Sequence, residues 1–114
     1  MITISENNNY NALSESTYYI LLSLLTPQHG YGIMQDVQKM SNGRLTLAPG
    51  TLYGAIKALL EKGWIEFSKD EDTEKRKKVY ILTSEGHQVL QSEIVRLKEL
   101  YQNGLVRMRG ETND

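Results

Sequence analysis

Helix-breaking residues divide the first half of this 114-residue chain into short segments. Pro27 prevents a helix from continuing, because proline lacks a backbone N–H and its ring clashes with the preceding turn. Asn42 and Gly43 together are typical of a helix end, and Gly63 is a second such end. Pro49 instead suits the first position of a helix, where the missing N–H would be unpaired anyway. We therefore expect several short helices in this half of the chain.

Apolar residues return to one side of a helix in three of these segments: about 12–25, about ten residues up to Asn42, and 49–62. The stripes consist of Leu13, Ile20, Leu21, Leu24 and Leu25 in the first segment, Ile33, Met34, Val37 and Met40 in the second, and Leu52, Ile56, Leu59 and Leu60 in the third. Between them we expect a turn at 28–32, "QHGYG", and a brief extended segment at 44–47, "RLTL". Three helices that share one core are therefore predicted.

The period of the apolar pattern changes after Gly63. Residues 64–69 and 77–82 are rich in aromatic and β-branched side chains, and a charged stretch separates them, which predicts a two-stranded hairpin with a long polar tip. Thr83 and Ser84 then supply N-cap oxygens for a last helix that runs to about Met108. Its apolar stripe is formed by Leu90, Ile94, Leu97, Tyr101 and Met108, and it is widened by Val89, Val95, Leu100 and Leu105.

The composition suits one small globular domain. The formal net charge is -1 and cysteine is absent, which excludes disulfides, thiolate metal ligands and a cysteine nucleophile. The longest apolar run, residues 18–25, is too short to span a bilayer, and the N-terminal region lacks the basic start of a signal peptide. We therefore expect a cytoplasmic protein without a membrane partner.

The order of helix, helix, helix, hairpin and helix resembles a helix-turn-helix followed by a wing. The predicted fold class is mainly α with a small β-hairpin wing: a winged helix-turn-helix plus a long C-terminal dimerisation helix. The expected divisions are a flexible N-terminal arm at 1–11, a winged helix-turn-helix DNA-binding domain at 12–83, the dimerisation helix at 84–108, and a disordered tail at 109–114.

Three motifs carry a resemblance to a known family. They are "HGYGI" at 29–33, "PGTLYGAIKALLEKGWI" at 49–65 and "KKVYILTSEGHQVL" at 77–90. Their order and spacing resemble those of the PadR family, the phenolic acid decarboxylase regulators, over roughly Tyr18 to Leu90. The resemblance implies a winged-helix transcriptional repressor that dimerises through its C-terminal helix, in the subgroup with a short C-terminal region. It also implies that a small aromatic or apolar effector can be a partner, although the only tryptophan, Trp64, is expected in the core.

The start of the third helix is a candidate DNA-binding element. With Pro49 at the first helical position, the N-cap is Ala48, which has no side-chain oxygen, so the first amides remain free for a phosphate. Thr51 adds a hydroxyl in the same turn, and Tyr53 and Lys57 are four residues apart and share a face. The alternative is that Tyr53 packs on the second helix and Lys57 is only solvated.

A basic run on the second hairpin strand is the next candidate for contact with DNA. It consists of Lys75, Arg76, Lys77 and Lys78. These residues would follow a phosphate backbone or enter a minor groove, or they are simply a solvated surface. Tyr31 matches a position that touches the DNA backbone in the PadR family, and its alternative role is packing.

The apolar stripe of the last helix is wider than contact with one small domain requires. We expect self-association through Leu90, Ile94, Leu97, Tyr101, Leu105 and Met108. The alternative, in which the last helix folds back on the first one, would cover only part of the stripe. A two-fold dimer would place two recognition helices about one DNA turn apart and would require a palindromic operator.

Enzymatic function finds no support in the sequence. His29 and His87 are the only histidines, and neither belongs to a nucleophile motif. The segment "GYGIMQ" lacks the third glycine of a dinucleotide fingerprint, and Lys75 stands where a calcium loop formed by 70–74 needs glycine. No catalysis, cofactor or metal is expected.

We therefore predict a homodimeric repressor that binds operator DNA and acts by occluding a promoter. The alternative belongs to another class: a winged-helix protein-interaction module, such as an antirepressor, that does not bind DNA. The near-neutral charge and the acidic tip of the hairpin favour this alternative. The uncapped helix start and the basic strand favour the repressor.

Overall fold

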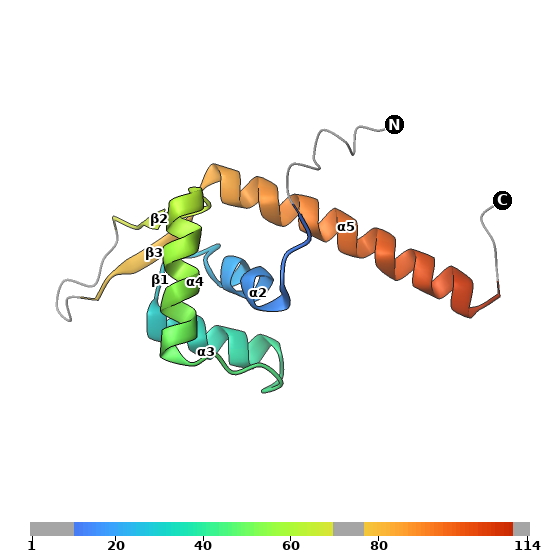
Figure 1. Ribbon diagram of the computed structural model, residues 1–114, viewed down its shortest axis with the longest axis horizontal. Coiled ribbons are helices and arrows are strands. Elements are labelled where there is room, and N and C mark those ends of the chain that lie inside the picture. Colours follow the sequence, from blue (N-terminus) through green and yellow to red (C-terminus); the bar gives the residue numbers. More distant parts are fainter. Residues whose placement is uncertain (1–10, 70–76, 111–114) are drawn as a thin grey trace.

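The computed structural model describes residues 11–69 and 77–110. Its elements are α2 (Glu15–Ser23), β1 (Gln28–His29), α3 (Gly30–Met40), α4 (Pro49–Lys62), β2 (Ile65–Phe67), β3 (Val79–Leu82) and α5 (Ser84–Met108). Helices α2, α3 and α4 and the sheet form a body at one end of the molecule, and α5 extends away from it (Figure 1). The predicted order of elements is therefore confirmed, with one strand added.

The helix ends follow the local chemistry of the sequence. Asn42 and Gly43 have left-handed φ angles of 56° and 79°, and the chain leaves α3 just before them. Gly63 ends α4 with a φ of 77°. The hydroxyl of Thr83 accepts a hydrogen bond from the backbone N–H of Gly86 at 3.0 Å and caps α5. The first helix is shorter than expected, because Ser14 caps it and regular helix stops at Ser23, ahead of Pro27.

The sheet has three antiparallel strands in the order β1-β3-β2, where the sequence predicted two. Residue Ile65 of β2 lies opposite Leu82 of β3, as in the expected hairpin. On its other edge, β3 pairs with β1, and Gln28 lies opposite Tyr80. The segment expected to be a turn is thus a short strand that leads directly into α3, and "RLTL" forms no strand.

The core lies between the three helices, the sheet and the beginning of α5. Its most buried members are Ile20, Leu21 and Leu24 near α2, Ile33 and Val37 of α3, Leu52, Ile56 and Leu59 of α4, Ile65, Tyr80 and Leu82 of the sheet, and Val89 and Leu90 of α5. Leu90 is only 3% exposed. This corrects the expectation that Leu90 faces a second subunit, because its side chain is buried in the core of its own chain.

Two polar anchors hold the loop between α3 and α4. The buried hydroxyl of Ser41 accepts a hydrogen bond from the backbone N–H of Leu45 at 3.0 Å. Arg44 and Glu15 form a two-pronged ion pair that links this loop to the start of α2. The part of the loop that follows α3 is therefore tied both to its own start and to α2.

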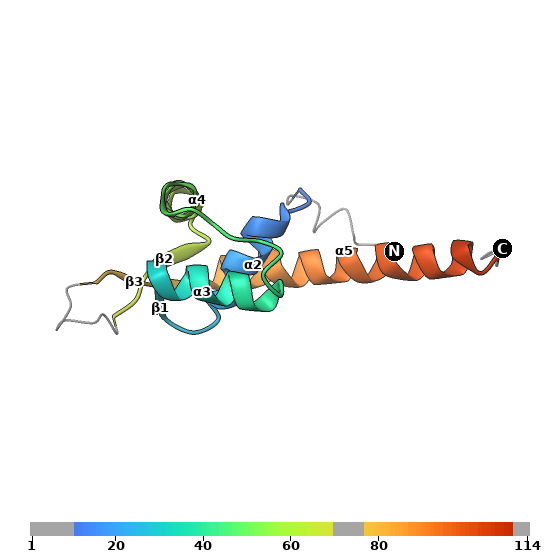
Figure 2. The same ribbon diagram turned by 90° about the horizontal axis from the view of Figure 1, so that it is seen from below.

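Helix α5 is 25 residues long, or about 37 Å at the usual rise per residue. Figure 2 shows α4 nearly end-on at the edge of the body and α5 running away from it. No helix of the described segments combines the length and the apolar character that crossing a membrane requires.

Candidate nucleic-acid interface

The start of α4 carries free amides, as the sequence predicted. Ala48 is the N-cap with extended backbone angles, and no side chain caps the helix. Pro49 occupies the first turn and contributes no N–H of its own. The positive end of the helix dipole and the remaining amides of the first turn thus face outward together, an arrangement that attracts an anion.

The outward face of α4 has two glycines without side chains and one cationic residue. Leu52, Ile56 and Leu59 turn inward and are at most 3% exposed. At roughly 100° per residue, Gly50, Gly54 and Lys57 lie on the opposite side of the helix. An added Cβ at Gly50 or Gly54 would meet no atom within 4 Å. A partner could therefore approach the backbone of α4 closely along this face.

Thr51 and Tyr53 are both exposed but lie on different flanks of this outward face. Side chains two positions apart in a helix differ by roughly 200° in direction, so Thr51 and Tyr53 diverge. Thr51 is on the flank that Ala55 and Ala58 share. Tyr53 leans the other way, toward α3, while Lys57 lies closer to Tyr53 than to Thr51. The three residues expected to act as one group therefore cover a broad surface.

Tyr53 contacts α3 and is still 48% exposed. Its hydroxyl lies over Gly30, where an added Cβ would come within 2.2 Å of the Tyr53 Oη atom. The packing alternative for Tyr53 is thus correct for the contact with α3. Because half of the residue remains exposed, the contact with α3 does not remove it from the surface.

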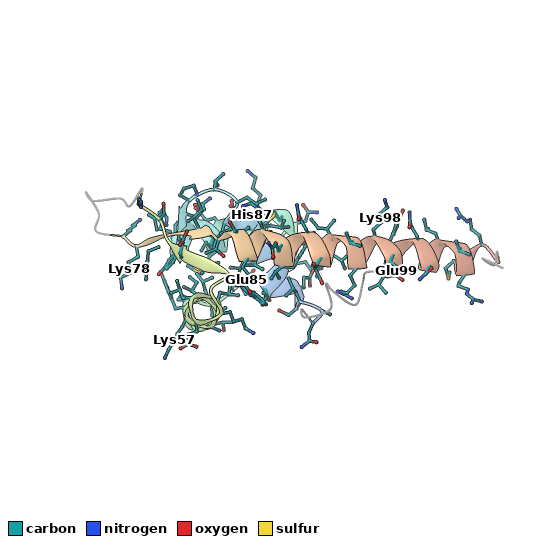
Figure 3. All side chains as sticks on the ribbon, turned by 90° about the horizontal axis from the view of Figure 1, so that it is seen from above. Lys57, Lys78, Glu85, His87, Lys98 and Glu99 are labelled. Atoms are coloured by element: carbon teal, nitrogen blue, oxygen red, sulfur yellow. The ribbon has the colours of Figure 1, made fainter. Side chains whose placement is uncertain are left out.

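Two of the wing lysines predicted to contact DNA lie in the described part of the chain. Lys78 is exposed, and its Nζ atom lies 5.6 Å from the ring centroid of Phe67, which is itself 54% exposed. Lys77 is half-buried. Lys57 and Lys78 point toward the same side of the molecule, far from Lys98 and Glu99 on α5 (Figure 3). The predicted contacts at Lys75 and Arg76 fall outside the described residues.

A pocket of about 210 Å³ lies where α3, α4 and β3 meet. It is lined by His29, Gly30, Tyr31, Tyr53, Lys77, Lys78 and Tyr80. Four of these residues were predicted to contact DNA, so the fold gathers positions that are far apart in the sequence. The other three were not predicted as site residues.

His29 and Tyr80 show why sequence reasoning missed part of this pocket. The Nδ1 atom of His29 accepts a hydrogen bond from the backbone N–H of Gly32 at 3.1 Å and so caps α3. A polar residue just before a helix could have indicated this role. Tyr80 is only 5% exposed. Burial, and then the nearby Tyr53, raise the pKa of the Tyr80 hydroxyl, which therefore stays protonated.

The predicted dimer residues beyond Leu90 are exposed on α5. Their exposed fractions are 47% for Ile94, 37% for Leu97, 67% for Tyr101, 38% for Leu105 and 88% for Met108. By helical geometry they fall within an arc of roughly 80°. Helix α5 contacts α2, as the alternative of a helix folded back on the first one expected, but no described residue of the chain's own body buries these five side chains.

One charged pair marks where the body of the domain ends on α5. Glu93 is only 5% exposed and binds Arg96 through two hydrogen bonds of 2.8 and 2.6 Å. The guanidinium of Arg96 is the main reason why the pKa of Glu93 lies below its usual value. Beyond this pair, no described residue that follows on α5 is fully buried.

In the described segments, no three acidic or histidine side chains gather closely enough to hold a metal ion.

A comparison with protein-family models decides the family. The model of the transcriptional regulator PadR-like family matches residues 19–92, well over half of the chain. The chain belongs to the PadR-like family. The resemblance carried by the three motifs is thus confirmed, and the PadR-like match covers α3, α4 and the whole sheet. The family consists of transcriptional regulators, so it lends no support to an enzymatic function.

Solved structures agree with the PadR-like fold. A transcriptional regulator from Clostridium thermocellum, Cth-833, is 24% identical with a TM-score of 0.64, over 81% of this chain and 89% of that one. A PadR family transcription regulator from Clostridium difficile R20291 is 26% identical with a TM-score of 0.61, over 83% and 97%. A PadR family transcriptional regulator from Eggerthella lenta DSM 2243 is 25% identical with a TM-score of 0.61, over 85% and 82%. The comparison with curated proteins found no match.

Proposed function

We propose that this PadR-like chain is a transcriptional repressor that binds a palindromic operator as a homodimer and places α4 in the major groove. One observation supports this proposal above all others. The outward face of α4 combines an uncapped N-terminus, two glycines without neighbours and Lys57. A helix that enters a major groove needs such a face, because the backbone must approach the bases and the phosphates closely.

The exposed stripe on α5 supports the homodimer. Five large apolar side chains on one arc of a single helix form a surface that water solvates poorly. A second copy of α5 would bury this arc through an isologous contact. Two recognition helices related by a two-fold axis would then bind the two halves of an inverted repeat.

Release by a small aromatic or apolar effector is also part of the proposal. Trp64 is not placed to bind such a molecule on α5, because it is half-buried beside the core and Lys62 Nζ lies 4.9 Å from its ring. Tyr101 is the one aromatic residue on the exposed stripe of α5. An effector between two subunits would therefore meet Tyr101 and aliphatic side chains.

A selection of bound sequences from random duplex DNA tests the proposal. We expect an inverted repeat whose half-sites are one helical turn apart, since the two subunits of a dimer would contact equivalent sequences. Enrichment of no sequence, by a protein shown to be folded and dimeric, would contradict the repressor.

One observation favours the second candidate, a protein-interaction module that does not bind DNA. Glu61 lies one turn after Lys57 on the same outward face of α4 and is exposed. A carboxylate in this position repels phosphate and partly cancels the charge of Lys57. A folded dimer that binds no DNA in the selection would be the result expected of this module.

A further inference from the structure

The pocket between α3, α4 and β3 has features of an anion site that is separate from the start of α4. We propose that it binds a phosphate group, supplied by the DNA backbone or by a free phosphate. If the phosphate belongs to the DNA backbone, the proposal rests on the proposed function of DNA binding. If it is a free phosphate, the proposal is independent of that function.

Tyr80 provides the first argument for a ligand. The residue is only 5% exposed, yet it lines the pocket. The hydroxyl of Tyr80 has no hydrogen-bond partner among the described residues. Every fully buried polar side-chain atom of these residues does have a partner. The hydroxyl must therefore open into the pocket. Because the hydroxyl has no partner within the described part of the chain, it is available to pair with an oxygen of a group bound in the pocket.

Tyr53 brings a second phenol to the same pocket. Its hydroxyl lies over Gly30, in space that exists only because Gly30 has no Cβ. The two phenols are close enough for Tyr53 to influence the ionisation of Tyr80. Two phenol hydroxyls, one from α4 and one from β3, can thus donate to the same acceptor group.

The remaining groups that line the pocket favour the binding of a negatively charged ligand. Lys77 and Lys78 bring ammonium groups from the strand side. Gly30 and Tyr31 are the first two residues of α3, so the positive end of that helix dipole faces the pocket. There is no carboxylate among the described residues that line it. The site therefore offers donors from a helix start, a strand and a neighbouring helix, which suits the several acceptor oxygens of a phosphate.

A phosphate in this pocket would fix the orientation of α4. Tyr53 belongs to α4, whereas Tyr80 belongs to β3 and the two lysines directly precede that strand. A DNA phosphate held between them would therefore set how α4 is rotated in the groove. Contacts of this kind position a protein on DNA without reading its sequence.

Removal of single hydroxyls tests the pocket. Tyr80→Phe and Tyr53→Phe keep the rings, and Tyr18→Phe is a matched control on α2, away from the pocket. With the operator found by selection, we expect fluorescence anisotropy to show roughly tenfold weaker binding for each pocket variant and unchanged binding for the control. Thermal unfolding of all three variants should match the wild type.

A second measurement distinguishes the two sources of phosphate. Inorganic phosphate is added at constant ionic strength, and the amide resonances of Gly30 and Tyr31 are followed by NMR. Saturable shifts that Tyr80→Phe abolishes, with DNA affinity unaffected by the variants, would assign the pocket to a free phosphate. Weaker DNA binding by both pocket variants would assign it to the DNA backbone.

These measurements distinguish a wrong phosphate site from a wrong repressor function. A wild-type protein that binds its operator, with neither pocket variant weakened and no shift caused by phosphate, overturns the phosphate site and leaves the repressor standing. A protein that binds no DNA but shows saturable phosphate shifts, lost in Tyr80→Phe, supports the site and overturns the repressor.

Discussion

Gly30 determines where the phenol of Tyr53 can lie. An added Cβ would come within 2.2 Å of the Tyr53 Oη atom and within 2.7 Å of its Cζ atom. Such distances do not occur between real atoms, so one of the two groups would have to move. Tyr53 is the group that can move, because its side chain is flexible and half exposed.

We therefore expect Gly30→Ala to retain the fold but to displace Tyr53 and weaken binding to the operator several-fold. In the background of Tyr53→Ala, the same substitution should have no further effect, because the displaced side chain is already missing. Anisotropy titrations of the four proteins in this cycle measure the coupling. Equal losses in both backgrounds would show that Gly30 acts independently of Tyr53.

The ends of the helices were the most predictable elements, and the short strand β1 was the least. Proline, glycine and N-cap residues act through local backbone chemistry, so Gly63 and Thr83 could be identified from the sequence alone. β1 has two residues, and it exists only because it pairs with β3, some fifty positions later. No local pattern indicates such a pairing.

The same distinction applies to the candidate site. The basic strand and the uncapped start of α4 were predicted, because spacing and capping are local properties. The pocket was not predicted, because Gly30, Tyr53 and Tyr80 are brought together by packing alone. Of the residues expected in a dimer contact, all but Leu90 are exposed on α5, and Leu90 was misplaced because an apolar stripe does not show where the core of the domain ends.

Gly63→Ala tests the contribution of the left-handed residue that ends α4. The residue has a φ of 77°, and an L-residue in this left-handed region is less stable by about 1 kcal/mol. We expect the free energy of unfolding in urea to fall by about that amount. Gly50→Ala is the matched control in the same helix, because it has no positive φ and no neighbour within 4 Å of a Cβ. Equal stability of the two variants would contradict this role of Gly63.

At the scale of the whole molecule, the proposed dimer depends on the exposed apolar stripe of α5. Leu97 lies within the exposed apolar arc, whereas Asn103 lies on the opposite side of the helix by its spacing. We expect Leu97→Asp to sediment as a monomer, because a buried, unpaired carboxylate would oppose the dimer contact. Asn103→Asp adds the same charge outside the arc and should remain a dimer. A dimeric Leu97→Asp protein would place the interface elsewhere.

The salt dependence of operator binding tests the central claim, that α4 and the wing bind DNA through its phosphates. The affinity of the wild type should fall steeply and linearly on a logarithmic scale as salt is added, because bound phosphates release counterions. Lys57→Ala should weaken binding and reduce the slope by about 1, while Arg107→Ala, in the last turn of α5, should leave both unchanged. Absent or salt-insensitive binding by the folded dimer would contradict the claim.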